Sequence, residues 1–367
     1  MEKLKLKSSV KAQKTVAKAK RHWMTIAFLL GFLVDNLTLN RVDQVFDNII
    51  LFFYVSLAMT SMLLMYAAMA DKLGENFALK TRKYAPLLIQ YSFGGLLSGM
   101  LIFYGRSGDW TQSWPFMVLI LVAIYGNETI SDRASRLLYN LAILFIGLFS
   151  YVVLVVPVLT GHMGAWIFVG SGVLALIIMS VFIRILTAII PNYMEMQMKT
   201  VIFSMGIIFV GFNTLYFTNI IPPIPLSLKD IGIYHSVVRF ENGDYQLKYE
   251  EGHWWQFYKD SDYVFHPKPG DNVFCFAKVF APARLKTDIY HVWEKKNKDG
   301  KWERQAKLSY YIAGGRADGY RGYTLIQNFS DGKWRCSVET ARGQALGKET
   351  FIIDSTEKPA PLVTIIE

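Results

Sequence analysis

Long apolar segments constrain the fold of this chain more than any other feature. A helix that crosses a hydrocarbon core about 30 Å thick needs roughly 20 mostly apolar residues. Seven segments reach or approach that length. They are Trp23 to Leu39, Val45 to Ala70, Pro86 to Tyr104, Trp114 to Tyr125, Leu137 to Leu159, Ala165 to Leu186 and Val201 to Ile221. The pattern predicts about seven membrane-spanning helices, with six as the alternative because the fourth segment is short.

Lys and Arg are distributed unevenly between the two sides of these segments. Short loops that remain in the cytoplasm carry an excess of Lys and Arg. The tail before Trp23 and the alternate loops on its side hold sixteen such residues, and the opposite side holds two, Arg41 and Arg106. This asymmetry predicts a cytoplasmic N-terminus. An odd number of spans then places everything after Pro222 outside the cytoplasm.

The basic tail at 1–22 suggests contact with a polyanion. Its lysines are not interleaved with aromatic or Arg side chains, and the first apolar segment follows at once. Contact with anionic lipid headgroups explains such a tail more simply than nucleic acid does. We therefore expect the lipid bilayer as its partner and no nucleic acid. The first apolar segment is also too long to be the apolar region of a cleaved signal peptide.

After residue 222 the sequence changes from long apolar segments to short runs rich in Val, Ile, Tyr, Phe and Trp. Asn242-Gly243, Asp299-Gly300 and Asp331-Gly332 separate such runs, where tight hairpins need residues that tolerate positive φ. The pattern predicts an all-β antiparallel sandwich, immunoglobulin-like. The expected strands are Ile233 to Phe240, Tyr245 to Glu250, Trp254 to Tyr258, Asn272 to Phe280, Lys286 to Glu294, Trp302 to Ile312, Tyr320 to Gln327, Lys333 to Thr340 and Lys348 to Ile353.

The charge balance supports a division of the chain near Pro222. Residues 222–367 hold 21 basic and 19 acidic residues, a net charge of +2, which leaves 18 and 10, a net of +8, for the preceding part of this +10 chain. We therefore expect four parts: a basic cytoplasmic tail at 1–22, a transmembrane helical domain at 23–221, a Pro-rich linker at 222–232 and an extracytoplasmic β-sandwich domain at 233–367.

Both cysteines, Cys275 and Cys336, fall on expected strands of this outer domain. In an oxidising periplasm two thiols of one sandwich can form a disulfide. Trp293 between them is similar to the immunoglobulin arrangement, in which a Trp packs on an inter-sheet bridge. The alternative is a pair of buried, reduced cysteines.

The region from 270 to 354 resembles the bacterial family of domain of unknown function 2914. An apolar strand is followed by His291-x-Trp293 and then by the turn Gly314-Gly315-Arg316. The remaining shared positions are Arg321 with Tyr323 and Thr324, Gly332-x-Trp334-Arg335, Gly343, Leu346 and Phe351. The sequence departs from the family at Tyr320, where a Trp is expected. The resemblance implies a secreted or membrane-tethered β domain and supplies no activity.

Five residues of this domain combine rings with guanidinium groups, which stack on sugars or bind carboxylates and phosphates. They are His291, Trp293, Arg316, Arg321 and Trp334. On one sheet face they could hold an envelope glycan or a periplasmic protein. The alternative is that both Trp rings belong to the core, that His291 caps one of them, and that the arginines brace turns. A second aromatic cluster, between His253 and His266, suggests either contact with the membrane interface or an edge hairpin.

Ionisable residues inside membrane segments are often functional. Asp35 and Asp47 flank the first outer loop, and Arg41 lies between them. Two facing carboxylates could bind a cation or relay protons, but both lie near an interface and Arg41 can neutralise one of them. The sequence thus leaves a transport or ligand role open beside a purely structural one.

The sequence contains no zinc-ligand spacing, phosphate-binding loop or nucleophile motif. We therefore predict no cofactor, no metal and no catalytic residue, and expect that the protein is not an enzyme. The expected function is that of a multi-pass bacterial inner-membrane protein whose periplasmic domain binds an envelope component or a protein partner, in an anchoring or sensing role. The alternative is a small-molecule transporter or membrane enzyme with the β domain as accessory. The oligomeric state is left open.

Overall fold

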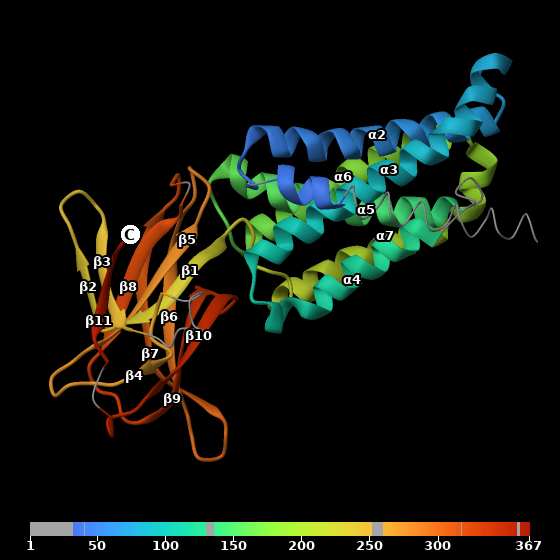
Figure 1. Cartoon of the computed structure of the whole chain (residues 1–367). Coiled ribbons are helices and arrows are strands. Elements are labelled where there is room, and N and C mark those ends of the chain that lie inside the picture. The colour runs from blue at the N-terminus through green and yellow to red at the C-terminus, as the bar shows by residue number, and fades with distance from the viewer. Residues whose placement is uncertain (1–31, 40, 130–135, 252–259, 317, 358–359) are drawn as a thin grey trace, which may run out of the picture. The chain divides into compact units, whose positions relative to one another are not determined.

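The computed structural model describes residues 32–39, 41–129, 136–251, 260–316, 318–357 and 360–367 (Figure 1). The chain forms two compact units. Unit 1 contains the segments up to Phe103, Met117–Val155 and Val169–Asn213, and unit 2 contains Tyr104–Phe116, Val156–Phe168 and Thr214–Glu367. The β strands therefore share a unit with three short segments from the helical part of the sequence.

Before residue 218, the described part of the chain is mainly helical. Helical residues 32–38 precede α2 (Val45–Met69), α3 (Glu75–Ser107), α4 (Trp110–Thr129), α5 (Leu137–Thr160), α6 (Ala165–Ile189) and α7 (Pro191–Phe217). Five of these, α2, α3, α5, α6 and α7, are long and apolar enough to cross a membrane. Helix α4 occupies the shortest of the predicted spans and is not among the five. Most of the predicted first span lies outside the described residues.

Close helix packing in unit 1 depends on glycine. A Cβ added at Gly172 of α6 would lie 2.7 Å from the Phe149 ring of α5 and 3.0 Å from the Phe209 ring of α7. A Cβ at Gly95 of α3 would lie 2.4 Å from the Tyr54 ring of α2. Small residues of this kind let helices approach each other closely.

After residue 226, the regular secondary structure of the described residues consists of strands. Their bounds are β1 (Ser227–Tyr234), β2 (Ser236–Arg239), β3 (Tyr245–Glu250), β4 (Val264–Phe265), β5 (Val273–Phe280), β6 (Lys286–Lys296), β7 (Trp302–Ala313), β8 (Tyr320–Ile326), β9 (Gly332–Thr340), β10 (Ala345–Ile353) and β11 (Leu362–Ile366). They form three sheets with the strand orders β1-β5-β8, β4-β10-β9-β6-β7 and β11-β3-β2. All pairings are antiparallel except that of β4 with β10.

One buried cluster joins the β1-β5-β8 sheet to the five-stranded sheet. Its members are Ile233, Phe265, Val273, Cys275, Trp293, Ile326, Trp334, Cys336, Phe351 and Ile353. A disulfide joins Cys275 of β5 to Cys336 of β9, with the two Cα atoms 6.6 Å apart. The apolar face of each alternating strand thus points into a shared core.

The structure differs from the sequence prediction at the start of the β region. Strand β1 begins at Ser227, inside the range 222–232 that was predicted as a linker, because Ser227 already pairs with Phe280 of β5. Helix α7 ends at Phe217, five residues before Pro222, the first proline of the predicted linker. Asn219 adopts a left-handed conformation with φ of 59°. The predicted single strand Ile233 to Phe240 is divided at His235 into β1 and β2.

Two of the predicted hairpin turns have the expected backbone. Gly243 and Gly300 have φ values of 91° and 79°, which favour glycine, and they lie between β2 and β3 and between β6 and β7. The predicted strand Trp254 to Tyr258 and most of the aromatic cluster between His253 and His266 lie outside the described residues.

Candidate functional site

His291 and Trp293, two residues of the predicted binding set, lie in the core. Both are fully buried on β6. Trp293 Nε1 donates to Thr324 Oγ1 of β8 at 3.0 Å, and His291 Nδ1 lies 3.0 Å from the same oxygen. His291 Nε2 lies 3.1 Å from the Tyr310 hydroxyl of β7. The two side chains therefore share one hydroxyl that links the two sheets, and they do not form an exposed surface.

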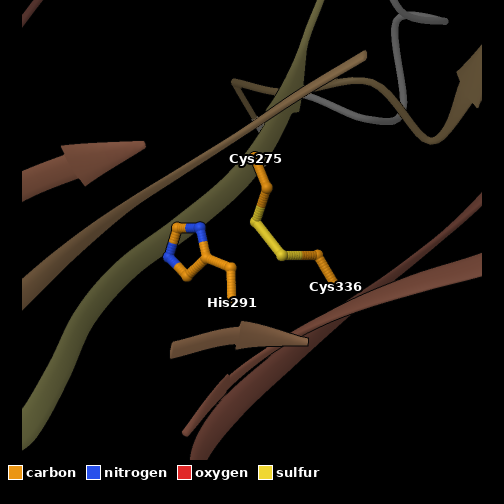
Figure 2. Close-up of side chains that lie close together, drawn as sticks. All are labelled: Cys275, His291 and Cys336. Carbon is orange, nitrogen blue, oxygen red and sulfur yellow. A yellow bond between two sulfur atoms is a disulfide. The ribbon is translucent and has the colours of Figure 1, made fainter. Parts of the chain in front are cut away.

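The His291 ring also lies beside the disulfide (Figure 2). One nitrogen of His291 and the Sγ atoms of Cys275 and Cys336 lie within 4.8 Å of one another. Both sulfurs are consumed by the disulfide, so this trio offers no thiolate ligands. Burial lowers the pKa of His291 to about 3, and the ring is neutral at physiological pH.

Each of the other three residues of the predicted set has a different environment. Trp334 is 2% exposed and donates from Nε1 to the Ser330 carbonyl at 2.8 Å. Arg321 forms an ion pair with Asp244 at 3.5 Å, and Arg316 is exposed after the end of β7. The five residues therefore do not gather on one face, because strand alternation turns the two Trp rings and His291 inward.

The opposite face of the five-stranded sheet carries aromatic rings covered by cations. The Arg335 guanidinium lies 4.4 Å from the centre of the Trp302 ring, and the Lys307 ammonium lies 4.4 Å from that of Tyr290. Arg335 also pairs with Glu294. These residues lie on β6, β7 and β9, and β7 is an edge strand. We call the set Tyr290, Trp302, Lys307, Tyr311 and Arg335 the ring–cation face.

The predicted intramembrane group lies in unit 1 before and at the start of α2. Asp47 is 1% exposed, and its Oδ2 accepts the backbone N–H of Arg41 at 3.0 Å. The Arg41 side chain pairs with Asp43 at 2.8 Å. Asp35 lies on the preceding helical segment. The Asp47 carboxylate thus accepts a hydrogen bond from the backbone of Arg41, whose guanidinium pairs with Asp43.

A cluster of histidines and carboxylates lies where β1 and β3 end and β2 begins, on either side of β4. His235 is the residue between β1 and β2, Glu250 ends β3, and Asp262 and His266 flank β4. His235 Nε2 lies 2.8 Å from Glu250 Oε1, and His266 Nδ1 lies 2.7 Å from Glu250 Oε2. The Glu250 carboxylate therefore bridges two imidazoles. We call His235, Glu250, Asp262 and His266 the His–carboxylate cluster.

The hydrogen bonds of the cluster fix the charge of Glu250. Burial by itself would raise the pKa of this carboxyl, but hydrogen bonds from His235, from the side chain and backbone of His266 and from the backbone of Ala360 lower it to about 2. The His235 ring stacks on the Phe265 ring at a centroid distance of 4.0 Å. An ionised carboxylate and an imidazole are thus held in fixed orientation inside the protein.

Sequence analysis missed His235, Glu250 and Asp262 and named His266 only as part of an aromatic cluster. The four residues are spread irregularly over 32 positions, so no spacing motif marks them. The available signal was a His or a carboxylate at the end of an expected strand, as with Glu250 at the end of β3.

A second polar contact in unit 2 joins the β9–β10 hairpin to the short helical segments. Lys348 Nζ lies 2.9 Å from Asp109 Oδ2, and the Ala345 N–H donates to Gln112 Oε1 at 3.1 Å. On the other side the Arg342 guanidinium stacks 4.1 Å from the centre of the Tyr216 ring. The hairpin therefore contacts both the start of α4 and the end of α7.

Comparisons with known proteins give little further information. No curated protein matches the chain. Among solved structures, the Pseudomonas fluorescens alkylpurine DNA glycosylase AlkC bound to DNA containing an abasic site analogue aligns with 86% of this chain and 99% of its own at 9% identity and a TM-score of 0.23. That score supports no common fold. Residues 286–353, from β6 to the end of β10, match the family model described as protein of unknown function DUF2914.

Proposed function

We propose that this chain is a multi-pass bacterial inner-membrane protein with about seven spans, whose periplasmic, immunoglobulin-like β sandwich binds an envelope component or a partner protein. The helical part anchors this domain, and the whole serves in anchoring or sensing. Five candidate spans and the excess of basic residues on one side of them support the membrane placement and orientation. The disulfide supports the periplasm because disulfides persist in oxidising compartments.

The ring–cation face carries the binding proposal. Tyr311 is 54% exposed on edge strand β7, and Lys307, four residues earlier on the same face, is exposed as well. Cations stacked on aromatic rings leave donors and ring edges for carboxylates, phosphates or sugars. An edge strand also offers backbone N–H and C=O groups to an extended partner. This face of β6, β7 and β9 is therefore where we expect the partner to bind.

Photo-crosslinking in cells tests this face. A photoreactive residue at Tyr311 should yield a discrete crosslinked species, whereas one at Val238 on β2, which is 45% exposed, should not. The substitution Lys307→Glu should abolish the Tyr311 adduct by reversing a charge on the same face. The control Lys298→Glu, exposed in the β6–β7 turn, should leave the adduct intact. Equal adducts at both positions, or an adduct that survives Lys307→Glu, would contradict the proposal.

One observation favours the alternative proposal of a small-molecule transporter. Polar groups meet between α3 and α4 of unit 1, where Gln90 Nε2 lies 3.3 Å from Glu128 Oε2 and Asn127 Nδ2 lies 3.2 Å from the Gln90 carbonyl. If these groups line a water-filled path, Gln90→Cys should react with a hydrophilic thiol reagent. The matched Phe93→Cys, at a fully buried position of the same helix, should not. Absence of reaction at both positions would rule out the path.

A further inference from the structure

We propose that His235, Glu250 and Asp262 form a binding site for a divalent metal ion of the Zn²⁺ and Mn²⁺ class. One ligand atom from each of the three residues lies within 4.8 Å of the other two. His235 Nε2 is 2.8 Å from Glu250 Oε1 and 3.8 Å from Asp262 Oδ2. Ligands about 2.0–2.2 Å from a tetrahedral ion are separated by roughly 3.3–3.6 Å. The two separations from His235 bracket that range, and the two carboxylates lie within 4.8 Å of each other, close enough for one ion to bind all three groups.

Outer hydrogen bonds orient each of the three ligands. Glu250 is held by His266 Nδ1 and by the backbone N–H groups of His266 and Ala360, at 2.7 to 3.1 Å. Asp262 Oδ1 accepts the backbone N–H of Glu250 at 2.6 Å, which leaves Oδ2 on the side of His235. Metal-binding carboxylates are ordinarily fixed by such outer contacts.

His235 has a carboxylate on the far side of its ring. Its Nδ1 lies 3.7 Å from Asp271 Oδ2. A metal-binding imidazole typically turns its second nitrogen toward a carboxylate, which fixes the tautomer. Binding of the metal at Nε2 requires the tautomer that carries its proton on Nδ1, and that Nδ1–H faces Asp271. The Glu250 oxygen that lies against Nε2 in the metal-free arrangement becomes a ligand beside it.

The charge of the site favours a cation. Glu250 and Asp262 are 7% and 2% exposed, and Asp271 adds a third carboxylate nearby. Buried carboxylates need a compensating positive charge. In the metal-free arrangement the two imidazoles supply hydrogen bonds to Glu250, and a divalent ion between His235, Glu250 and Asp262 would compensate both buried carboxylates directly.

The ligand set selects the class of ion. One imidazole nitrogen with two carboxylate oxygens suits Zn²⁺ or Mn²⁺, whereas Mg²⁺ prefers six oxygen ligands in an octahedron. Three protein ligands leave one position for water or a bound group. A surface hollow of about 650 Å³ is lined by Lys268, Gln327 and Asp271, whose carboxylate lies 3.7 Å from His235 Nδ1. The site is separate from the ring–cation face and does not rest on partner binding there.

Metal titration of the full-length protein tests the site. The protein is purified in detergent without an oligohistidine tag, stripped with a chelator and titrated with Zn²⁺, Mn²⁺ and Mg²⁺ by calorimetry. We expect one equivalent of Zn²⁺ or Mn²⁺ to bind and Mg²⁺ not to compete. Because His266 orients a ligand, His266→Ala should weaken binding by about 10- to 100-fold. Asp262→Asn and His235→Gln should weaken it further. His162→Ala, at an exposed histidine outside the cluster, should change nothing.

Folding of each variant is checked by circular dichroism and by the mass of the intact disulfide form. If the ligand variants do not fold, the Co²⁺ spectrum of the wild-type protein decides, because imidazole and carboxylate ligation in a four-coordinate site gives visible bands that aqueous Co²⁺ lacks. A folded wild-type protein that takes up no stoichiometric ion overturns the proposal. Uptake that is unchanged in folded Asp262→Asn, or a Co²⁺ spectrum like that in buffer, overturns it as well.

Discussion

At the scale of single residues, His291 and Trp293, which were predicted to bind a partner, instead form hydrogen bonds inside the core. The Thr324 hydroxyl serves both Trp293 and His291, which lie on a strand of the other sheet. Because Trp293 N–H donates to the hydroxyl oxygen, the hydroxyl proton can go to Nδ1 of neutral His291, and Nε2–H can donate to Tyr310. Buried polar networks of this kind specify one packing of the core when every member has its partner.

Replacement of the shared hydroxyl should destabilise the β region. Thr324→Val keeps the shape of the side chain but leaves the Trp293 N–H and the His291 nitrogen without this partner, which should cost about 1–3 kcal/mol. The free energy of unfolding by denaturant measures it. Thr364→Val, at an exposed position of β11, is the control and should be nearly neutral. Equal effects of the two substitutions would contradict the assigned network.

The buried imidazole should make stability depend on pH. The pKa of His291 is about 3 in the folded state and about 6.5 in an unfolded chain, so the unfolded state binds the extra proton first as pH falls. Stability should therefore fall from about pH 6.5 downward toward pH 3, by at most about 1.4 kcal/mol per pH unit for this group. Unfolding measured across this range should show a smaller slope for His291→Gln, and an unchanged slope would contradict neutral burial.

At the scale of elements, apolar length and alternation located most helices and strands. The bounds of α5, α6, β3 and β7 lie within three residues of the predicted ones because each is set by a run of side chains that lipid or core must cover. Strands β4 and β11 carry too little local signal, since β4 has two residues and depends on parallel pairing with β10. Such pairing is a tertiary property that local sequence does not encode.

The helices of unit 1 offer a matched test of close packing. In α6, Gly172→Ala places a methyl group 2.7 Å from the Phe149 ring, whereas Gly170→Ala meets nothing within 4 Å. Both substitutions have the same helix propensity. We expect Gly172→Ala to cost about 1–3 kcal/mol through overpacking and Gly170→Ala to be tolerated. Heating in detergent followed by size-exclusion chromatography measures the difference. If both variants lose their monodisperse fraction at the same temperature, the packing is not as described.

Candidate sites were harder to predict than elements. The sequence offered a disulfide between Cys275 and Cys336 beside a reduced pair, because both fall on expected strands of a domain expected in the periplasm, and the structure contains the disulfide. It could not identify the His–carboxylate cluster, since His235 and Glu250 meet only through the antiparallel pairing of β2 with β3, where Ser236 lies opposite Lys248. Likewise, residue type alone made His291, Trp293 and Trp334 resemble ligand-binding residues. They are buried because each lies on the core-facing side of its strand.

At the scale of the whole molecule, one unusual composition is divided between two environments. The hydrophobic 52% is concentrated in helices, five of which are long and apolar enough to cross a membrane, and the β region carries nearly balanced charge. A disulfide in the latter agrees with an oxidising compartment. The proposed partner face needs that placement, because it would meet the envelope only from outside the cytoplasm.

The compartment in which the β region lies is therefore the central point to test. The most direct measurement is a pair of reporters fused after Glu367. One is an enzyme that is active only in the periplasm, and the other is a fluorescent protein that folds only in the cytoplasm. An odd number of spans with a cytoplasmic N-terminus predicts an active enzyme and a dark fluorescent protein. A fluorescent fusion with an inactive enzyme would contradict the odd span count and place the β region in the cytoplasm.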